Sequence, residues 1–162
     1  MIKKVLSVLL VIFLLIQFYP RAAKNNNPDA SNDLARVHAV PQSVTNILKT
    51  SCYDCHSNQT NYPWYSYIQP VSFWLNDHIV EGKKELNFSE FATYTLARQF
   101  RKLEEINGEV KDNEMPLESY SFIHTDSKLS PEQKLLLANW TDALRDSMQK
   151  VYPPDSLVRK KK

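Results

Sequence analysis

Two cysteines three positions apart, with a histidine directly after the second, are the residues of this chain best suited to chemistry. They are Cys52, Cys55 and His56, and the chain contains no other cysteine. Thiols at this spacing can add to the two vinyl groups of a haem, and the adjacent imidazole can then reach the iron as an axial ligand. Cys-x-x-Cys-His is the sequence pattern of c-type haem attachment. We therefore predict one haem c, held covalently through Cys52 and Cys55 and ligated by His56.

Three other chemistries could use the same residues. The two cysteines could form a disulfide in an oxidising compartment. They could also act as a thioredoxin-like redox pair, although the chain lacks the βαβ pattern of that fold. Zinc could be held by both thiols, His56 and either His78 or His124. The aromatic residues near the motif favour haem, because they supply more apolar surface than a small zinc site needs: Tyr53, Tyr62, Trp64, Tyr65 and Tyr67.

A second axial ligand to the iron is predicted at Met115. The proline that follows it disfavours helical geometry at Met115, which would present the thioether from a loop. A methionine that merely fills a gap in the core is the ordinary alternative. His78 is the main rival as distal ligand, and His124 is a further candidate. Methionine–histidine ligation would raise the reduction potential of the iron.

The composition indicates a helical protein that does not bind nucleic acid. The chain has 162 residues, with 20 basic and 18 acidic side chains and a net charge of +2. A nucleic-acid-binding domain would normally show a basic face or stripe. Only two glycines are present, which is few for a protein rich in β-hairpins, because tight hairpin turns depend on glycine.

An export signal is expected at the N-terminus. Lys3 and Lys4 precede an almost uninterrupted apolar run from Val5 to Tyr19. A cleaved signal peptide needs small residues at positions −3 and −1, and cleavage after Ala22 or Ala23 would place proline or arginine at −3. An uncleaved membrane anchor is therefore the favoured interpretation.

The anchor would be short. Fifteen helical residues span about 22 Å, against a hydrocarbon core of about 30 Å. Local thinning of the bilayer or snorkelling of flanking side chains would have to make up the difference. The two N-terminal lysines favour a cytoplasmic N-terminus. We expect the protein in a bacterial inner membrane, with its haem domain facing the periplasm.

Four segments are expected along the chain. Residues 1–23 form the signal or membrane anchor, and residues 24–38 form a polar linker. Residues 39–152 form the haem-binding domain, and residues 153–162 form a basic tail.

Periodic apolar residues predict an all-α domain. A first helix through Val40, Val44, Ile47 and Leu48 would deliver the two cysteines at its end. A second is expected from Val71 to Glu81, stopping at Gly82.

Two further helices complete the expected fold. One should begin with Ser89 as its N-cap and continue to Val110, with Asn107-Gly108 as a candidate interruption. The last should begin at Ser130-Pro131, and its inward face should consist of Leu136, Leu137, Trp140, Leu144 and Met148. Residues 111–125 are expected to form a loop.

The stretch from Ser51 to Trp140 resembles the bacterial haem-binding domain family of exported proteins with one Cys-x-x-Cys-His motif. The matching segments are Ser51 to Asn58, Tyr62 to Tyr65, Pro70 to Ser72, His78 to Gly82, Leu86 to Glu90, and Glu114 to Leu117. The resemblance implies a small cytochrome c-like helical domain around one haem. It also implies a ligand role for Met115, which matches the family's Met-Pro motif, and it keeps His78 as a rival.

These features favour a membrane-tethered one-electron carrier that exchanges electrons with redox partner proteins. An iron with two protein ligands has no open position for a substrate. An enzyme such as a peroxidase or oxidase would need that open position, and a single haem motif excludes a di-haem peroxidase. The remaining alternative is a haem-based sensor or a subunit of a larger redox enzyme.

Overall fold

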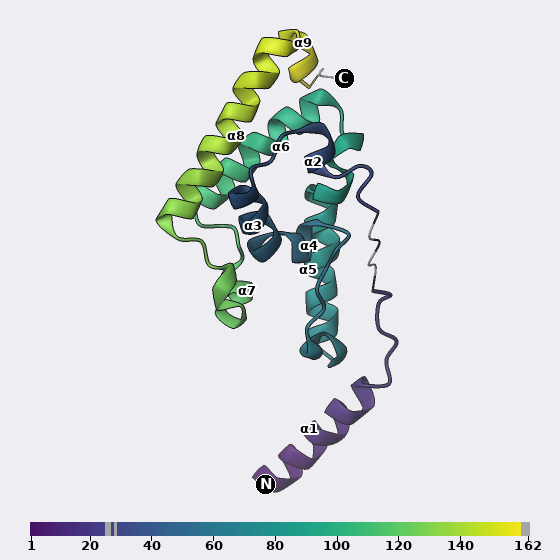
Figure 1. Cartoon of the computed structure of the whole chain (residues 1–162). Coiled ribbons are helices and arrows are strands. Elements are labelled where there is room, and N and C mark those ends of the chain that lie inside the picture. Colours follow the sequence, from purple (N-terminus) through teal and green to yellow (C-terminus); the bar gives the residue numbers. More distant parts are fainter. Residues whose placement is uncertain (25–26, 28, 160–162) are drawn as a thin grey trace.

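The fold is all-α in the part of the chain that the structure describes, as predicted. The structure is a computed structural model that describes residues 1–24, 27 and 29–159, and within these residues every regular element is a helix (Figure 1). Part of the predicted linker, at residues 25–26 and 28, and the last three residues of the predicted basic tail, 160–162, lie outside the described residues.

The N-terminal helix stands apart from the rest of the molecule. Helix α1 spans Ile2–Ile16, and none of its 15 residues is buried. It projects away from the other helices (Figure 1). Over the described residues, no helix combines the length and the apolar character needed to cross a membrane. The predicted anchor thus forms a helix, and its spanning of a bilayer is not borne out.

The Cys-x-x-Cys-His motif lies at the junction of two helices. Helix α3 (Gln42–Ser51) ends at Cys52, and the short helix α4 (Tyr53–His56) begins directly after it. The buried face of α3 includes Val44 and Leu48, as its periodicity predicts. This face packs into the core and thereby fixes the position of Cys52.

The longest helix pair is formed by α6 (Leu96–Lys111) and α8 (Pro131–Val151), with α9 (Pro154–Leu157) packed on α6. The start of α8 is confirmed, because Ser130 and Gln133 form a reciprocal capping box ahead of the helix. Most of its predicted inward face is also correct. Leu136 is the exception, because it is 38% exposed, whereas Leu137 beside it is buried.

The predicted start of the third helix was wrong. Residues Phe88–Thr93 form a 3-10 helix, η2, which is capped by the Asn87 side chain rather than by Ser89. Thr95 caps α6 by accepting a hydrogen bond from the Arg98 backbone N–H at 3.3 Å. Asn107-Gly108 does not interrupt α6, which continues to Lys111.

Shorter elements complete the domain. They are α2 (Leu34–Val37), η1 (Trp64–Tyr67), α5 (Val71–Glu85), α7 (Glu118–Ile123) and η3 (Thr125–Ser127). Helix α7 falls inside the stretch expected to be a loop. Leu34 lies in the predicted linker, yet it is completely buried in the core with Phe91 and Leu103. The second half of that linker therefore packs as part of the domain.

Helix α5 was predicted to stop at Gly82, but it continues to Glu85. Gly82 is needed because α5 and α4 approach each other closely at this position, and not because a helix ends there. A Cβ at Gly82 would lie 2.8 Å from the Cys55 carbonyl oxygen, whereas a Cβ at Gly108 would meet nothing within 4 Å. Gly82 thus lets α5 pack directly on the backbone of α4.

The two glycines give a matched pair of substitutions. Gly108→Ala should raise the free energy of unfolding by about 0.5–1 kcal/mol, because alanine is the better helix former. Gly82→Ala should instead lower it by about 1–3 kcal/mol, because the new methyl group overlaps a backbone atom that cannot easily move. Urea unfolding followed by circular dichroism measures both. Equal stabilisation by the two variants would contradict the close packing of α5 on α4.

Candidate functional site

The motif opens into a cleft made of two adjoining cavities, with volumes of about 210 and 260 Å³. Residues shared by both linings make them two parts of one site: Ser51, Cys52, His56, Glu85, Met115 and Pro116. Taken together, the cavities reach the range of roughly 300–1,000 Å³ typical of small-molecule and cofactor sites. Apolar side chains from η2 and α6, including Phe88 and Ile106, line the first cavity.

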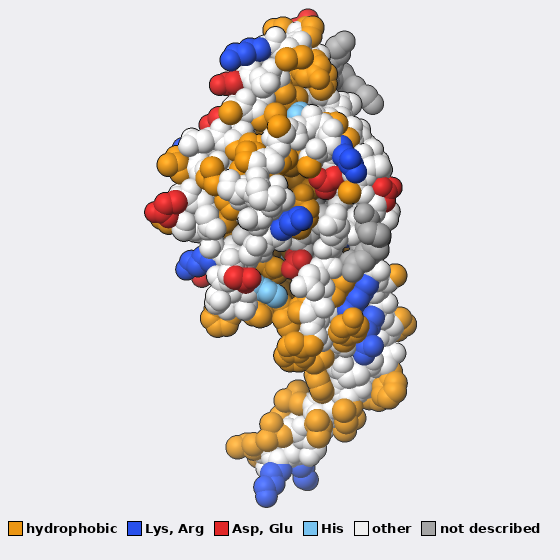
Figure 2. Space-filling model, viewed as in Figure 1, with side chains coloured by type: hydrophobic (Ala, Val, Ile, Leu, Met, Phe, Trp, Pro, Cys, Tyr) orange, Lys and Arg blue, Asp and Glu red, His pale blue; other side chains and the backbone are white. Residues whose placement is uncertain are grey.

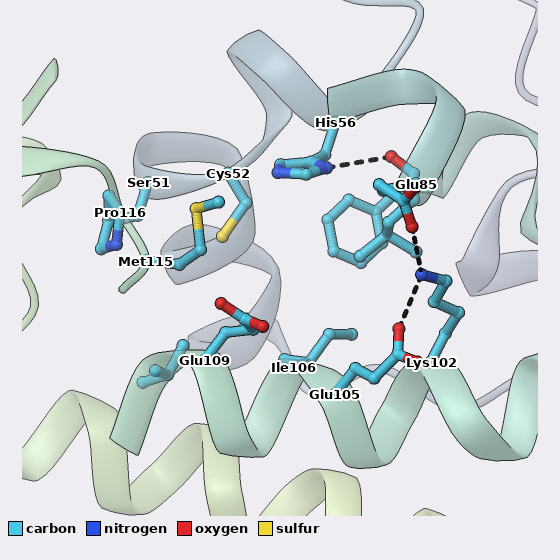
Figure 3. Close-up of a pocket in the computed structure, with 13 residues that line it drawn as sticks. Ser51, Cys52, His56, Glu85, Lys102, Glu105, Ile106, Glu109, Met115 and Pro116 are labelled. Carbon is cyan, nitrogen blue, oxygen red and sulfur yellow. Dashed lines mark hydrogen bonds and ion pairs between the residues drawn. The ribbon is translucent and has the colours of Figure 1, made fainter. Parts of the chain in front are cut away.

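His56 has its imidazole fixed in the orientation that a metal ligand needs. Its Nδ1 lies 3.0 Å from the Leu86 carbonyl oxygen (Figure 3). Because a carbonyl can only accept a hydrogen bond, Nδ1 carries the proton and Nε2 keeps its lone pair. Burial lowers the pKa of His56, and hydrogen bonding to the Leu86 backbone partly opposes this shift. The ring therefore stays neutral at pH 7 and can bind a metal through Nε2.

Both cysteines are free thiols at the wall of the cleft. Cys52 lines both cavities and Cys55 lines the second. Burial raises the pKa of Cys52 to about 12. Burial and the neighbouring Asp54 carboxylate raise the pKa of Cys55 to about 11. A thioredoxin-like cysteine needs a lowered pKa, so this environment argues against a redox-active pair.

The zinc alternative finds no ligand set in the described part of the chain. There, no three His, Cys, Asp or Glu side chains are grouped so that they could hold a metal ion. His124 lies away from the cleft, where its Nε2 is 2.5 Å from the Tyr65 hydroxyl and its ring stacks on Tyr120. His124 therefore contributes to neither cavity of the cleft, although it lines another hollow together with the motif residues Tyr53 and Asp54.

Met115 lies in the same cleft as His56. It is on the loop between α6 and α7, and its side chain lines both cavities next to Cys52 (Figure 3). Its backbone N–H donates to the Glu109 carbonyl at 3.2 Å, which fixes the loop to the end of α6. The same cavity is thus lined by all four residues predicted to bind the cofactor: Cys52, Cys55, His56 and Met115.

His78 also lines the second cavity. Its Nδ1 donates to the Trp74 carbonyl oxygen at 2.8 Å, so its Nε2 is free, as in His56. The imidazole packs beside the Trp74 ring, with the ring centroids 4.4 Å apart. His78 therefore remains the rival of Met115 as the second protein ligand to a haem iron.

No sequence-based prediction covered a cluster of charged side chains that lines the first cavity, in which a buried lysine contacts one exposed and one partly exposed glutamate. Lys102 is buried on α6, and its Nζ lies 3.1 Å from a Glu85 carboxylate oxygen and 2.6 Å from a Glu105 carboxylate oxygen. The cluster forms one wall of the cleft (Figure 3). Lys102 lies next to Leu103 on the buried face of α6. This position was the only sign in the sequence that the Lys102 side chain faces inward.

A hydrogen bond holds α7 against the motif. The Tyr120 hydroxyl donates to Asp54 Oδ2 at 2.7 Å, while Asp54 Oδ1 accepts the Asn61 backbone N–H at 2.9 Å. Burial, together with the hydrogen bond to Asp54, raises the pKa of Tyr120, so the phenol stays protonated. Because α7 follows Met115 directly, this contact and the bond from Met115 to Glu109 fix both ends of the Met115 loop.

Comparison with known families agrees with this site. The family model described as haem-binding domain matches residues 11–143, which is well over half of the chain. The chain therefore belongs to the haem-binding domain family, which supports haem as its cofactor. No curated protein gives a significant match, and neither does any solved structure.

The contact between Tyr120 and Asp54 should stabilise the loop that carries Met115. We expect Tyr120→Phe to lower the free energy of unfolding by about 1–2 kcal/mol, which is modest for a hydrogen bond to a charged group because Tyr120 is only half-buried. Tyr152→Phe, at the exposed end of α8, should change stability by less than about 0.5 kcal/mol. Amide hydrogen exchange should also rise between residues 113 and 123 in Tyr120→Phe alone. Unchanged exchange there would show that the hydrogen bond does not hold the loop.

Proposed function

We propose that this haem protein is a c-type one-electron carrier, with a single haem attached through Cys52 and Cys55. The observation that carries the proposal is the meeting of both thiols, the His56 imidazole and the Met115 thioether in one cleft. Thioether formation requires the two sulfurs at one wall and the histidine beside them, as the junction of α3 and α4 provides. When bound, the haem supplies a one-electron couple at its iron.

The residues of the chain fit that cofactor in distinct ways. His56 is neutral and oriented by the Leu86 carbonyl, so it would hold the iron through Nε2. Met115 would supply a second protein ligand to the iron, and an iron with no open position favours electron exchange over substrate binding. The apolar walls would keep water away from the macrocycle. Soft thioether ligation stabilises the reduced iron and so raises the potential.

Membrane attachment through α1 is part of the proposal. This helix has apolar side chains exposed on every side, from Val5 to Leu15, and cationic Lys3 and Lys4 at its start. Apolar surface of that extent is costly in water. We propose that α1 inserts into the inner membrane, with the flanking cations extending its reach. The haem domain would then face the periplasm and meet its redox partner proteins there.

Covalent attachment is the feature that separates haem c from a haem bound non-covalently. We expect the denatured protein to keep its haem through extraction with acidified organic solvent and to stain for haem peroxidase activity on a gel. Cys52→Ala or Cys55→Ala should weaken the stain, and the double variant should abolish it, because no thioether can form. Loss of all stain from the unsubstituted protein would refute c-type attachment.

The distal ligand can be identified by absorption spectroscopy. An oxidised haem with methionine and histidine ligands shows a weak far-red charge-transfer band. Met115→Ala should remove this band, lower the reduction potential and open the iron to carbon monoxide, since the sulfur ligand is gone. His78→Ala is the matched control and should leave the band unchanged.

The opposite pattern would assign the ligand to His78. In that case the native protein would lack the band, Met115→Ala would leave the potential unchanged, and His78→Ala would alter the spectrum. The carrier function survives that result, because two histidines also close the iron. A native iron that binds carbon monoxide readily would instead favour a sensor or enzyme.

A further inference from the structure

The end of the haem domain nearest α1 carries an exposed apolar surface. Helix α1 emerges below this end in Figure 1, and Figure 2 shows hydrophobic side chains gathered there. Its members, which we call the aromatic end surface, come from η1, the start of α5 and the end of α7: Trp64, Tyr67, Val71, Phe73, Trp74, Phe122 and Ile123. Trp64 is 75% exposed and Phe122 is 84% exposed, whereas large aromatic side chains in a water-soluble domain are usually well buried.

The three elements form one surface rather than separate patches. Helix α5 packs on η1. The Tyr65 hydroxyl of η1 lies 2.5 Å from His124, which ends α7. The exposed aromatic side chains on both sides of this contact therefore belong to one end of the domain.

The chain leaving α1 is docked on this surface. Gln17 and Gln69 are joined by two hydrogen bonds, from Gln17 Nε2 to the Gln69 carbonyl at 2.9 Å and from the Gln69 N–H to Gln17 Oε1 at 3.0 Å. The rings of Tyr19 and Phe73 meet edge to face, with centroids 5.0 Å apart. The apolar helix and the aromatic end surface are thus continuous, and the same medium should cover both.

Cationic side chains border the same region. Lys24 Nζ lies over the Tyr67 ring, 2.9 Å from its centroid, and donates to Ser66 Oγ at 2.7 Å. Arg21 lies between Tyr19 and Lys24 in the sequence and is exposed. Tryptophan, tyrosine and cationic residues next to an apolar helix are typical of the level of lipid headgroups. Anionic lipids attract such cations as well.

We propose that the aromatic end surface lies in the headgroup region of the same bilayer that holds α1. This inference rests on the proposed membrane attachment of α1. It makes the haem domain a body seated on the membrane, rather than one that swings on a free tether.

Thiol accessibility in vesicles tests the proposal. The full-length holoprotein is reconstituted at low protein-to-lipid ratio into vesicles of phosphatidylcholine and phosphatidylglycerol at seven to three. Single variants carry a new thiol on the aromatic end surface (Phe73→Cys, Phe122→Cys), on α1 (Leu10→Cys) or at the exposed far end of the domain (Val151→Cys, Val158→Cys). Each is reacted with a water-soluble polyethylene glycol maleimide and compared with its own rate in urea. The haem spectrum checks that each variant is folded, and the unsubstituted protein gives the background from Cys52 and Cys55.

The thiols at positions 73 and 122 should react roughly tenfold more slowly than those at 151 and 158, because the headgroup region shields them from the polymer. If position 10 is protected while positions 73 and 122 react as fast as 151 and 158, the seated domain is refuted and membrane attachment stands. If position 10 is also unprotected and the protein does not float with the vesicles, both proposals fail. Protection at 73 and 122 that appears only at high protein-to-lipid ratio would assign the surface to a second copy of the chain and refute the lipid contact.

Discussion

The packing of α4 directly on α5 is the constraint on which the site depends. Gly82 allows this approach, because any side chain at that position would overlap the Cys55 carbonyl oxygen. The close contact brings the C-terminal end of α5 beside the motif, where the Leu86 carbonyl accepts the Nδ1–H of His56. One glycine thus sets the distance at which a backbone carbonyl can orient the imidazole. A fixed imidazole with a free Nε2 is what a metal ligand requires.

The rest of the domain holds the opposite wall of the cleft. Helices α6 and α8 form a helix pair, which is supported by the capping box at the start of α8 and by the buried face of α6. The Met115 loop is fixed to α6, because the Met115 backbone N–H donates to the Glu109 carbonyl. The contact between Tyr120 and Asp54 returns α7 to the motif. Met115 is therefore held from two directions, although it lies on a loop, and this would suit the ligand role that we propose for it.

The sequence was sufficient for the all-α class and for the start of α8, because helical periodicity and caps are local signals. It failed at Gly82 and Ser89 for physical reasons. A glycine commonly follows the end of a helix because the backbone there adopts the left-handed conformation. Gly82 is instead required because α4 packs closely against it, and the local sequence does not reveal that neighbour. Ser89 has the composition of an N-cap, but Asn87 and Thr95 make the capping hydrogen bonds. Lys102 was missed because charged residues are expected outside, and its partner Glu85 lies on another helix.

Covalent haem attachment in this cleft can be tested with a crystal structure of the holoprotein that includes an iron-edge anomalous difference map. We expect one iron peak in the cleft, next to His56 Nε2, and continuous electron density from the haem to both Cys52 and Cys55. Met115 should lie on the opposite side of the iron from His56. An iron peak away from His56, or two cysteines joined to each other instead of to a haem, would contradict the account.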